Sequence, residues 1–178
     1  PEFDERTDVL SLFLRSTYDD GSAMTRGEIG DELLAILAAG HETTAPTLAW
    51  AFERISRHPE ALARLADEAA TEANTYRQAT LFEVQRNRTV IDFAGRHVAA
   101  PTYELGEWVI PQGFSIMVSL LQLHRDPAVY PDPERFDPQR FLNDKPSTYS
   151  WVPFGGGTRR CVGAAFANME MDVVLRTV

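Results

Sequence analysis

The residues best suited to chemistry lie near the end of the chain, where residues 154–163 read Phe-Gly-Gly-Gly-Thr-Arg-Arg-Cys-Val-Gly. Glycines let a backbone approach a ligand closely, and a thiolate needs cationic neighbours or backbone N–H donors to hold its charge. The residues after Gly163 have helix-forming composition, so Cys161 is expected just before a helix N-terminus, where free amides favour an anion. The pattern indicates a cysteine loop that binds a ligand.

Two other interpretations of this loop are open. A lone cysteine without context is more often an inert, buried side chain that follows a flexible turn. A phosphate-binding loop is disfavoured because no Lys-Ser/Thr pair follows the glycines and the G-x-G-x-x-G register is absent. Cys161 is the single cysteine of the chain, which excludes an internal disulfide and a cysteine-rich zinc site and fits a reducing compartment.

A second cluster occupies residues 39–44, which read Ala-Gly-His-Glu-Thr-Thr. In the simpler interpretation, Glu42 is exposed to solvent and the threonines bond back to the preceding turn. In the other, Gly40 leaves room for a ligand, and Pro46 cannot donate to the carbonyl of Glu42, so the helix should open or bend there and admit water or oxygen. A His-Glu-x-x-His zinc site is excluded because residue 45 is Ala.

Two weaker signals lie between these clusters. Glu83 and Arg86 are three residues apart on one predicted helix face, where they can form an ion pair. Residues 126–153 contain six prolines and include Phe-Asp-Pro-Gln-Arg-Phe at 136–141. Such a stretch is typical of an ordered meander or a linker, because proline disfavours both regular helix and central strand.

The remaining periodicity predicts mainly helix with short strands. Thr25 and Glu28 form a capping-box pattern that opens a helix of about thirty residues, roughly 45 Å long. Pro59 opens a second helix, and a third spans about 74–86. From Thr89 the apolar period changes towards two. The predicted strand residues are Val90, Ile91, Phe93, Tyr103, Leu105, Trp108 and Ile110.

The composition sets the class of the chain. Its 178 residues are 44% hydrophobic and 24% charged, which excludes collagen-like, disordered and coiled-coil classes. A net charge of −9 argues against a nucleic-acid partner. Because the longest apolar run is too short to cross a bilayer and no signal peptide is visible, we expect a soluble, cytoplasmic protein. The chain starts at Pro1 and stops at Val178 within a helix-like stretch, so we expect a piece of a longer protein.

Taken in their order along the chain, the four signals resemble the C-terminal half of a cytochrome P450, a haem-thiolate monooxygenase. The family's cysteine pattern Phe-x-x-Gly-x-Arg-x-Cys-x-Gly fits Phe154, Gly157, Arg159, Cys161 and Gly163. The long helix fits Ala-Gly-x-Glu-Thr-Thr, and Glu-x-x-Arg and Phe-x-Pro-x-Arg-Phe follow in the expected order. The resemblance implies a mainly α fold with small β-sheets, in which residues 1–178 form part of one P450 domain, the haem-binding C-terminal portion.

The resemblance also implies the cofactor, haem b (iron protoporphyrin IX). Cys161 would be the thiolate ligand of the iron, and its sulfur would be tuned by the loop amides and Phe154. Glu42 and Thr43 would be the acid and alcohol that stabilise dioxygen and relay protons from water. Gly40 would be a further cofactor-binding residue, together with the loop glycines.

Other roles follow from the same resemblance. Arg159 would bind one haem propionate, and Arg96, placed in a Gly95–Arg96 turn, would bind the second. Ile36, Ala39 and a strand over residues 90–93 would border the substrate pocket.

The resemblance further implies a buried triad of Glu83, Arg86 and an arginine of the meander. We choose Arg140 over Arg135, because residues 136–141 have the fuller family pattern.

The activity so implied is hydroxylation of a small apolar substrate by O₂. Electrons would come from NAD(P)H through a ferredoxin or flavoprotein reductase. A haem-thiolate isomerase or peroxygenase is disfavoured by the Glu42–Thr43 pair, since those chemistries need no proton relay to dioxygen. Members of the family are more than twice this length, so the remaining alternative is a truncated or non-catalytic fragment that does not hold haem on its own.

Overall fold

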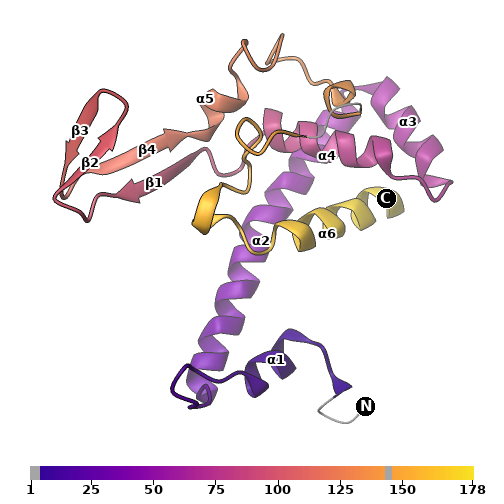
Figure 1. Ribbon diagram of the computed structural model, residues 1–178. Helices are drawn as coiled ribbons and strands as arrows, with labels where there is room; N and C mark the ends of the chain where they lie inside the picture. The colour runs from indigo at the N-terminus through magenta and orange to yellow at the C-terminus, as the bar shows by residue number, and fades with distance from the viewer. Residues whose placement is uncertain (1–4, 143–145) are drawn as a thin grey trace. The chain divides into compact units, whose positions relative to one another are not determined.

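The computed structural model describes residues 5–142 and 146–178, so residues 1–4 and 143–145 of the predicted domain lie outside the described residues. The predicted class is confirmed, because helices dominate and the strands form two small sheets (Figure 1). The chain divides into two compact units, one ending at Glu42 and the other beginning at Thr43. The boundary between the units falls within the longest helix.

The first unit contains the capped start of the longest helix. Helix α1 (Val9–Arg15) comes first, and α2 (Arg26–Ser56) begins directly after Thr25. The Thr25 hydroxyl accepts from the Glu28 N–H at 3.3 Å, and the Glu28 carboxylate accepts from the Thr25 N–H at 2.7 Å. This reciprocal pair is the predicted capping box, and it satisfies two amides that have no partner inside the helix.

Helix α2 has 31 residues, as predicted, and is assigned as helix without interruption at Pro46. The prediction that the helix opens at this proline is therefore wrong. At the next residue, the Thr47 hydroxyl donates to the carbonyl of Thr43 at 2.8 Å, the back-bonding that threonine commonly makes in helices. One missing main-chain bond is tolerated where the turns on either side remain intact.

Three further helices of the second unit pack against one another (Figure 1). They are α3 (Pro59–Ala69), α4 (Thr75–Asn87) and α6 (Ala164–Thr177). The first two confirm the sequence prediction, including proline at the first position of α3. The core of the second unit combines these helices with the end of α2 and the meander. Its buried residues are Ala51, Ile55, Ala61, Leu65, Tyr76, Leu81, Val84, Phe136, Met171 and Leu175.

Helix α4 is buried on nearly every side, and several of its polar groups have partners on neighbouring elements. Arg77, almost fully buried, donates to both carboxylate oxygens of Asp172 on α6, at 2.7 and 3.2 Å. The Glu68 carboxylate on α3 accepts the backbone N–H groups of Tyr76 and Arg77, at 2.7 and 2.8 Å. A side chain of one helix therefore caps the N-terminus of the next.

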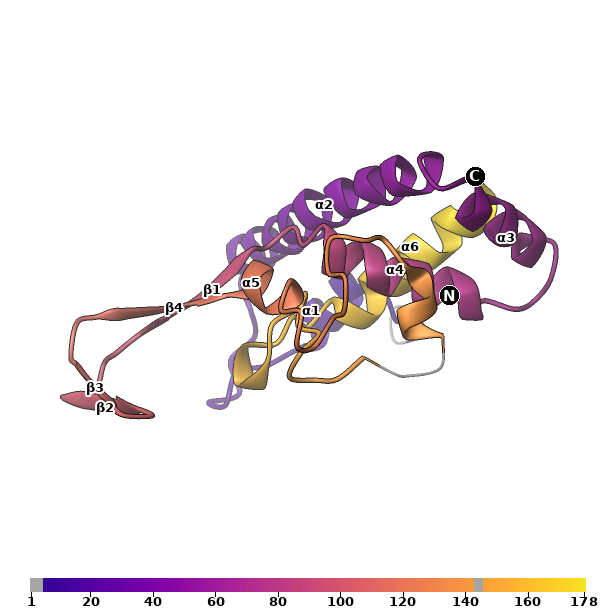
Figure 2. The ribbon, with the colours of Figure 1, turned by 90° about the horizontal axis from the view of Figure 1, so that it is seen from above.

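The strands form two antiparallel pairs. Strand β1 (Phe93–His97) pairs with β4 (Ser115–Ser119), and β2 (Thr102–Leu105) pairs with β3 (Trp108–Pro111). The β2–β3 hairpin lies between β1 and β4 in sequence, and Figures 1 and 2 show it at the end of the β1–β4 ribbon furthest from the helices of the second unit.

Two strand predictions need correction. Val90 and Ile91 lie in a bend before the sheet, because β1 begins only at Phe93, where pairing with Ser119 of β4 begins. The predicted Gly95–Arg96 turn lies inside β1, since both residues pair with β4. The position of the partner strand decides these limits, and alternation of apolar residues does not encode it.

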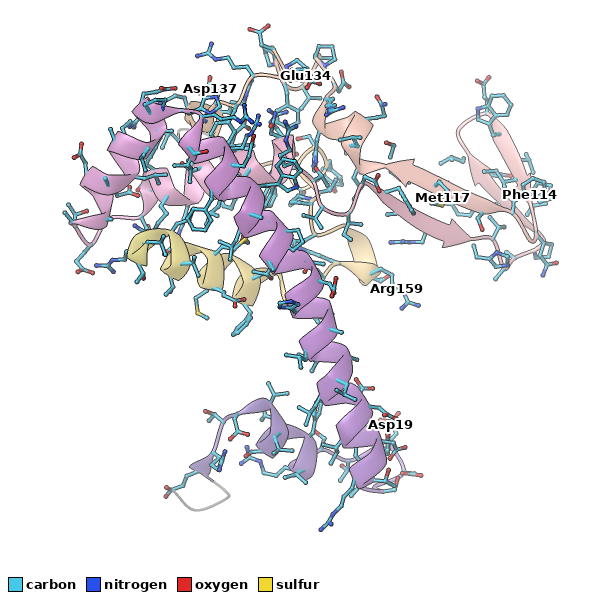
Figure 3. All side chains as sticks on the ribbon, turned by 180° about the vertical axis from the view of Figure 1, so that it is seen from behind. Asp19, Phe114, Met117, Glu134, Asp137 and Arg159 are labelled. Carbon is cyan, nitrogen blue, oxygen red and sulfur yellow. The ribbon has the colours of Figure 1, made fainter. Side chains whose placement is uncertain are left out.

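Helix α5 (Leu120–His124) follows β4, and the meander begins after it. Within residues 125–142 and 146–153, the meander contains one short 3₁₀ helix, η2 (Pro138–Phe141), and no α-helix or strand. This agrees with the prediction from its proline content. Figure 3 shows the meander residues Glu134 and Asp137, and on the far side of the unit Phe114 and Met117 of the sheet region.

In the described residues, no helix combines the length and the apolar character that a membrane crossing requires.

Candidate functional site

The cysteine loop lies between the meander and α6. A 3₁₀ turn, η3 (Gly157–Arg159), precedes Cys161, and Gly163 is the residue before the first turn of α6. The Cys161 N–H donates to the carbonyl of Phe154 at 2.9 Å, which closes the loop. Cys161 is free and exposed, so the alternative of a buried cysteine is wrong.

The loop glycines have the backbone conformations that their type permits. Gly155 and Gly157 have φ of +69° and +63°, a region that side-chain-bearing residues rarely adopt. A Cβ at Gly156 or Gly157 would meet nothing within 4 Å, so the loop borders open space. A Cβ at Gly163 would lie 3.8 Å from the Cys161 sulfur, which places the thiol beside the start of α6.

Aromatic rings support the entrance to this loop. Trp151 packs edge-on against Phe82 of α4 and against Phe154, with centroid distances of 4.9 and 6.1 Å. The Trp151 Nε1–H also donates to the Phe82 carbonyl at 3.0 Å. Phe154, expected beside the sulfur, therefore belongs to an aromatic cluster that joins the loop to α4.

The predicted ion pair on α4 is fully buried. The Arg86 guanidinium donates to both oxygens of Glu83, at 2.7 and 2.8 Å, and neither side chain is exposed. Glu83 also accepts the backbone N–H of Asp137 at 2.8 Å. Burial raises the pKa of the Glu83 carboxyl, while hydrogen bonds from Arg86 act in the opposite direction.

The third member of the triad is Arg140, as the sequence pattern predicted. Its Nε lies 3.6 Å from Glu83 Oε1, an ion pair beyond hydrogen-bond length. Arg135 instead lies near Asp137 at 3.9 Å with an exposed side chain, and it meets Arg86 only through its carbonyl, at 3.3 Å.

Sequence reasoning missed His124, which is fully buried at the end of α5. Its Nδ1 lies 2.7 Å from Thr89 Oγ1, and its Nε2 accepts the N–H of Val152 at 3.0 Å. The Arg86 guanidinium donates to its backbone carbonyl at 2.8 Å. Burial, and secondarily the Arg86 charge, lowers the pKa of His124 to about 4. No local motif pointed to His124, because its partners lie 28 and 35 residues away.

The acid–alcohol cluster spans the boundary between the units. Gly40 and Glu42 belong to the first unit and are exposed there. Thr43 begins the second unit and is half-buried. The exposure of Glu42 agrees with the simpler interpretation, in which this side chain meets solvent.

The two predicted propionate-binding arginines are both exposed. Arg159 lies in η3, two residues before Cys161, and Figure 3 shows its side chain directed outward from the loop. Arg96 lies on β1, and its guanidinium donates to the carbonyl of Gly95 at 2.7 Å. Both guanidinium groups are accessible to an anionic partner.

Comparison with known proteins defines the class. The family model described as "Cytochrome P450" matches residues 2–178, and the chain therefore belongs to the cytochrome P450 family.

Among its relatives, "Putative cytochrome P450 138" of Mycobacterium tuberculosis is 67% identical over the whole chain. "Putative cytochrome P450 135B1" of Mycobacterium bovis is 41% identical over 184 aligned residues. The solved structure "Retinoic acid bound cyanobacterial CYP120A1" matches 94% of this chain with a TM-score of 0.86 and 30% identity.

The chain is much shorter than these proteins. It spans 40% of the length of the first relative, 39% of the second and 42% of the solved structure.

Membership of this family implies a haem cofactor, and the described residues fit one. An accessible thiol stands at the start of a helix, beside glycines that leave open space. An exposed arginine two residues away can pair with a carboxylate. These are the donor types that a haem with an axial thiolate requires.

Proposed function

We propose that the protein binds haem b through the Cys161 thiolate and serves the hydroxylation of a small apolar substrate by O₂. Electrons would come from NAD(P)H through a separate ferredoxin or flavoprotein reductase. The observation that carries the proposal is the exposed Cys161 thiol, in a chain of the P450 family whose cysteine pattern is complete.

The loop would stabilise the sulfur as an anion. Cys161 lies two residues before Gly163, the N-cap of α6, and a helix N-terminus favours a nearby anion, to which Arg159 and Arg160 add positive charge. Arg159 and Arg96 would pair with the haem propionates, for which guanidinium is well suited. Gly40, Gly157 and Gly163 would permit close approach of the ring.

When bound, the thiolate-ligated haem supplies the oxygen-activating chemistry. Glu42 and Thr43 would hold and transfer protons at the carboxylate and the Oγ1 hydroxyl, a general-acid role. Ile36, Ala39 and residues 90–93 would border the substrate and exclude water. Of these, the residues Ile36 and Phe93 are each about half exposed, which leaves apolar area available for contact.

Haem reconstitution tests the proposed ligand. The chain, loaded with haem, reduced and exposed to carbon monoxide, should show the red-shifted Soret band of a thiolate-ligated haem. Cys161→Ser should lose that band, and the exposed neighbour Val162, changed to Ala, should keep it. A histidine-like spectrum in the unmodified protein would refute thiolate ligation.

Peroxide release tests the catalytic part. In a reductase-supported holoenzyme, Thr43→Ala should release more peroxide per O₂ consumed while haem content stays unchanged. The reason is that the Thr43 hydroxyl would no longer relay protons to dioxygen. Equal coupling in the variant and the unmodified protein would rule out the relay.

A second candidate is that this chain alone is non-catalytic and does not hold haem. Its span of 40% of the relatives' length favours this alternative, since a porphyrin needs protein on both faces to exclude water. Failure to take up stoichiometric haem would support it.

A further inference from the structure

The segment that enters the cysteine loop, residues 150–152, is held at three successive positions. We call it the entry segment. Locally, the Trp151 N–H donates to the Ser147 carbonyl at 2.9 Å. Three further bonds join the segment to residues at least 20 positions away: Tyr130 Oη donates to the Ser150 carbonyl at 3.1 Å, Trp151 Nε1 donates to the Phe82 carbonyl at 3.0 Å, and the Val152 N–H donates to His124 Nε2 at 3.0 Å. Of these three bonds, only the last holds the segment through a backbone N–H.

The bond to Val152 fixes the protonation of His124. A backbone N–H can only donate, so Nε2 must accept and the proton of the neutral ring must be on Nδ1. Nδ1 then donates to Thr89 Oγ1 at 2.7 Å. The Thr89 hydroxyl can donate in turn to the carbonyl of Gln85, at 2.9 Å, or Arg86, at 3.1 Å. Every ring nitrogen and hydroxyl in this chain of bonds has a partner of the right kind.

Backbone bonds continue from Val152 to the cysteine. The Val152 carbonyl accepts the N–H of Gly155 at 2.9 Å, and the Phe154 carbonyl accepts the N–H of Cys161 at 2.9 Å. A turn over residues 152–155 and a loop over residues 154–161, each closed by one of these bonds, therefore overlap between Val152 and Cys161. A shift at Val152 would be transmitted through the turn to the loop.

His124 is itself held in place. Its side chain is fully buried, and its carbonyl receives the Arg86 guanidinium. Arg86 is paired with Glu83 in the same buried cluster, and its guanidinium carbon lies 5.0 Å from the centre of the Tyr130 ring. Arg86 of this ion pair therefore contacts both His124 and Tyr130, two of the three residues that bond to the entry segment from a distance in sequence.

We propose that His124 is a positioning residue for the cysteine loop. It acts on Cys161 through the backbone of Val152 and keeps the thiol in one place whether or not a cofactor is bound. The inference depends on the proposed haem function only where haem spectra are used to test it.

Two substitutions separate the ring nitrogens. The amide of Gln reaches about as far as Nε2, so His124→Gln can still accept from Val152 but cannot serve Thr89. The amide of Asn reaches about as far as Nδ1, so His124→Asn keeps the Thr89 bond and loses the Val152 bond. A purely space-filling histidine would predict similar damage in both variants.

Amide hydrogen exchange in the haem-free chain provides the first readout. In His124→Asn, the Val152 amide should exchange roughly tenfold faster, as expected for loss of one hydrogen bond, and Cys161 should react faster with a thiol reagent. His124→Gln should remain close to the unmodified protein in both measurements. The same changes at His97, an exposed histidine on β1, are the matched controls and should alter neither. Equal protection of Val152 in both His124 variants, or equal loss, would overturn the proposal.

Nitrogen chemical shifts of the His124 ring give a readout that needs no variant to fold. The proposal requires the Nδ1–H tautomer in the unmodified chain at neutral pH. A ring protonated at Nε2 would overturn it.

Haem spectra separate this proposal from the proposed function. If the unmodified chain takes up haem with thiolate ligation, His124→Asn should retain haem and lose part of the thiolate band. His124→Gln should retain both the haem and the full thiolate band. If the unmodified chain takes up no haem, the proposed function fails for this chain, and the exchange and tautomer results still decide the role of His124.

Discussion

At the scale of single residues, the stability of the second unit should depend strongly on the buried Glu83–Arg86 pair. Two charges with no exposed surface are stable only because each satisfies the other and both bind backbone groups. Glu83→Gln would leave Arg86 charged and incompletely paired. We expect a loss of about 3–5 kcal/mol in the free energy of unfolding, measured by urea denaturation.

Glu134 provides the control for this prediction. Its carboxylate pairs with Arg125 at 3.3 Å, but 71% of its side chain is exposed. Because solvent screens such a pair, Glu134→Gln should cost less than about 1 kcal/mol. Similar losses in the two variants would show that burial of the Glu83 pair is not what makes it important.

His124 should make folding sensitive to acid. Burial lowers its pKa from 6.5 to about 4, so the unfolded chain binds a proton at higher pH than the folded chain does. Its contribution to stability is therefore complete above about pH 6.5 and is lost as the pH falls towards 4, by about 3 kcal/mol in all.

Unfolding free energies measured from pH 8 to pH 4 check this sign. Other groups titrate in the same range, so the informative quantity is the difference between the unmodified chain and His124→Gln. That difference should change with pH between 6.5 and 4 and be flat above 6.5. A difference independent of pH would mean that His124 is protonated equally in both states.

At the scale of secondary-structure elements, α4 depends on its neighbours for its start. No side chain of its own N-terminal residue caps it, and Glu68 of α3 accepts two of its first amides instead. Glu68→Ala should cost about 1–2 kcal/mol, the range of an N-cap loss. Faster hydrogen exchange at Tyr76 and Arg77 should accompany the lower urea midpoint.

Glu72 is a matched control for this cap. It lies four residues after Glu68, and its side chain is 93% exposed in an ion pair with Arg176. Glu72→Ala should change stability by less than about 1 kcal/mol and leave the α4 amides protected. If it destabilises the chain as much as Glu68→Ala, general charge effects would replace capping as the explanation.

At the scale of the whole molecule, a bound haem should stabilise the folded chain by mass action. A ligand that binds only the folded state adds about 2.7 kcal/mol to the free energy of unfolding when the free ligand concentration is one hundred times its dissociation constant. Urea unfolding with and without haem measures this gain, which should disappear in Cys161→Ser and persist in Val162→Ala. A gain that survives the loss of the thiol would indicate adsorption of haem elsewhere.

Much of the site could be predicted from the sequence because its signals are local. The Thr25–Glu28 cap, the ion pair of Glu83 and Arg86, and the position of Cys161 before a helix all involve residues within a few positions of one another. Each depends on helix geometry or on backbone conformations that the residue types already restrict.

Tertiary structure alone decided the rest. The extent of β1 depends on where β4 lies, which moved Arg96 from a predicted turn into a strand. The bond from His124 to Val152 and the ion pair of Arg77 with Asp172 join residues 28 and 95 positions apart. Such partners are selected when separate elements pack together and bury polar groups that must then be satisfied, and no short-range periodicity records that choice.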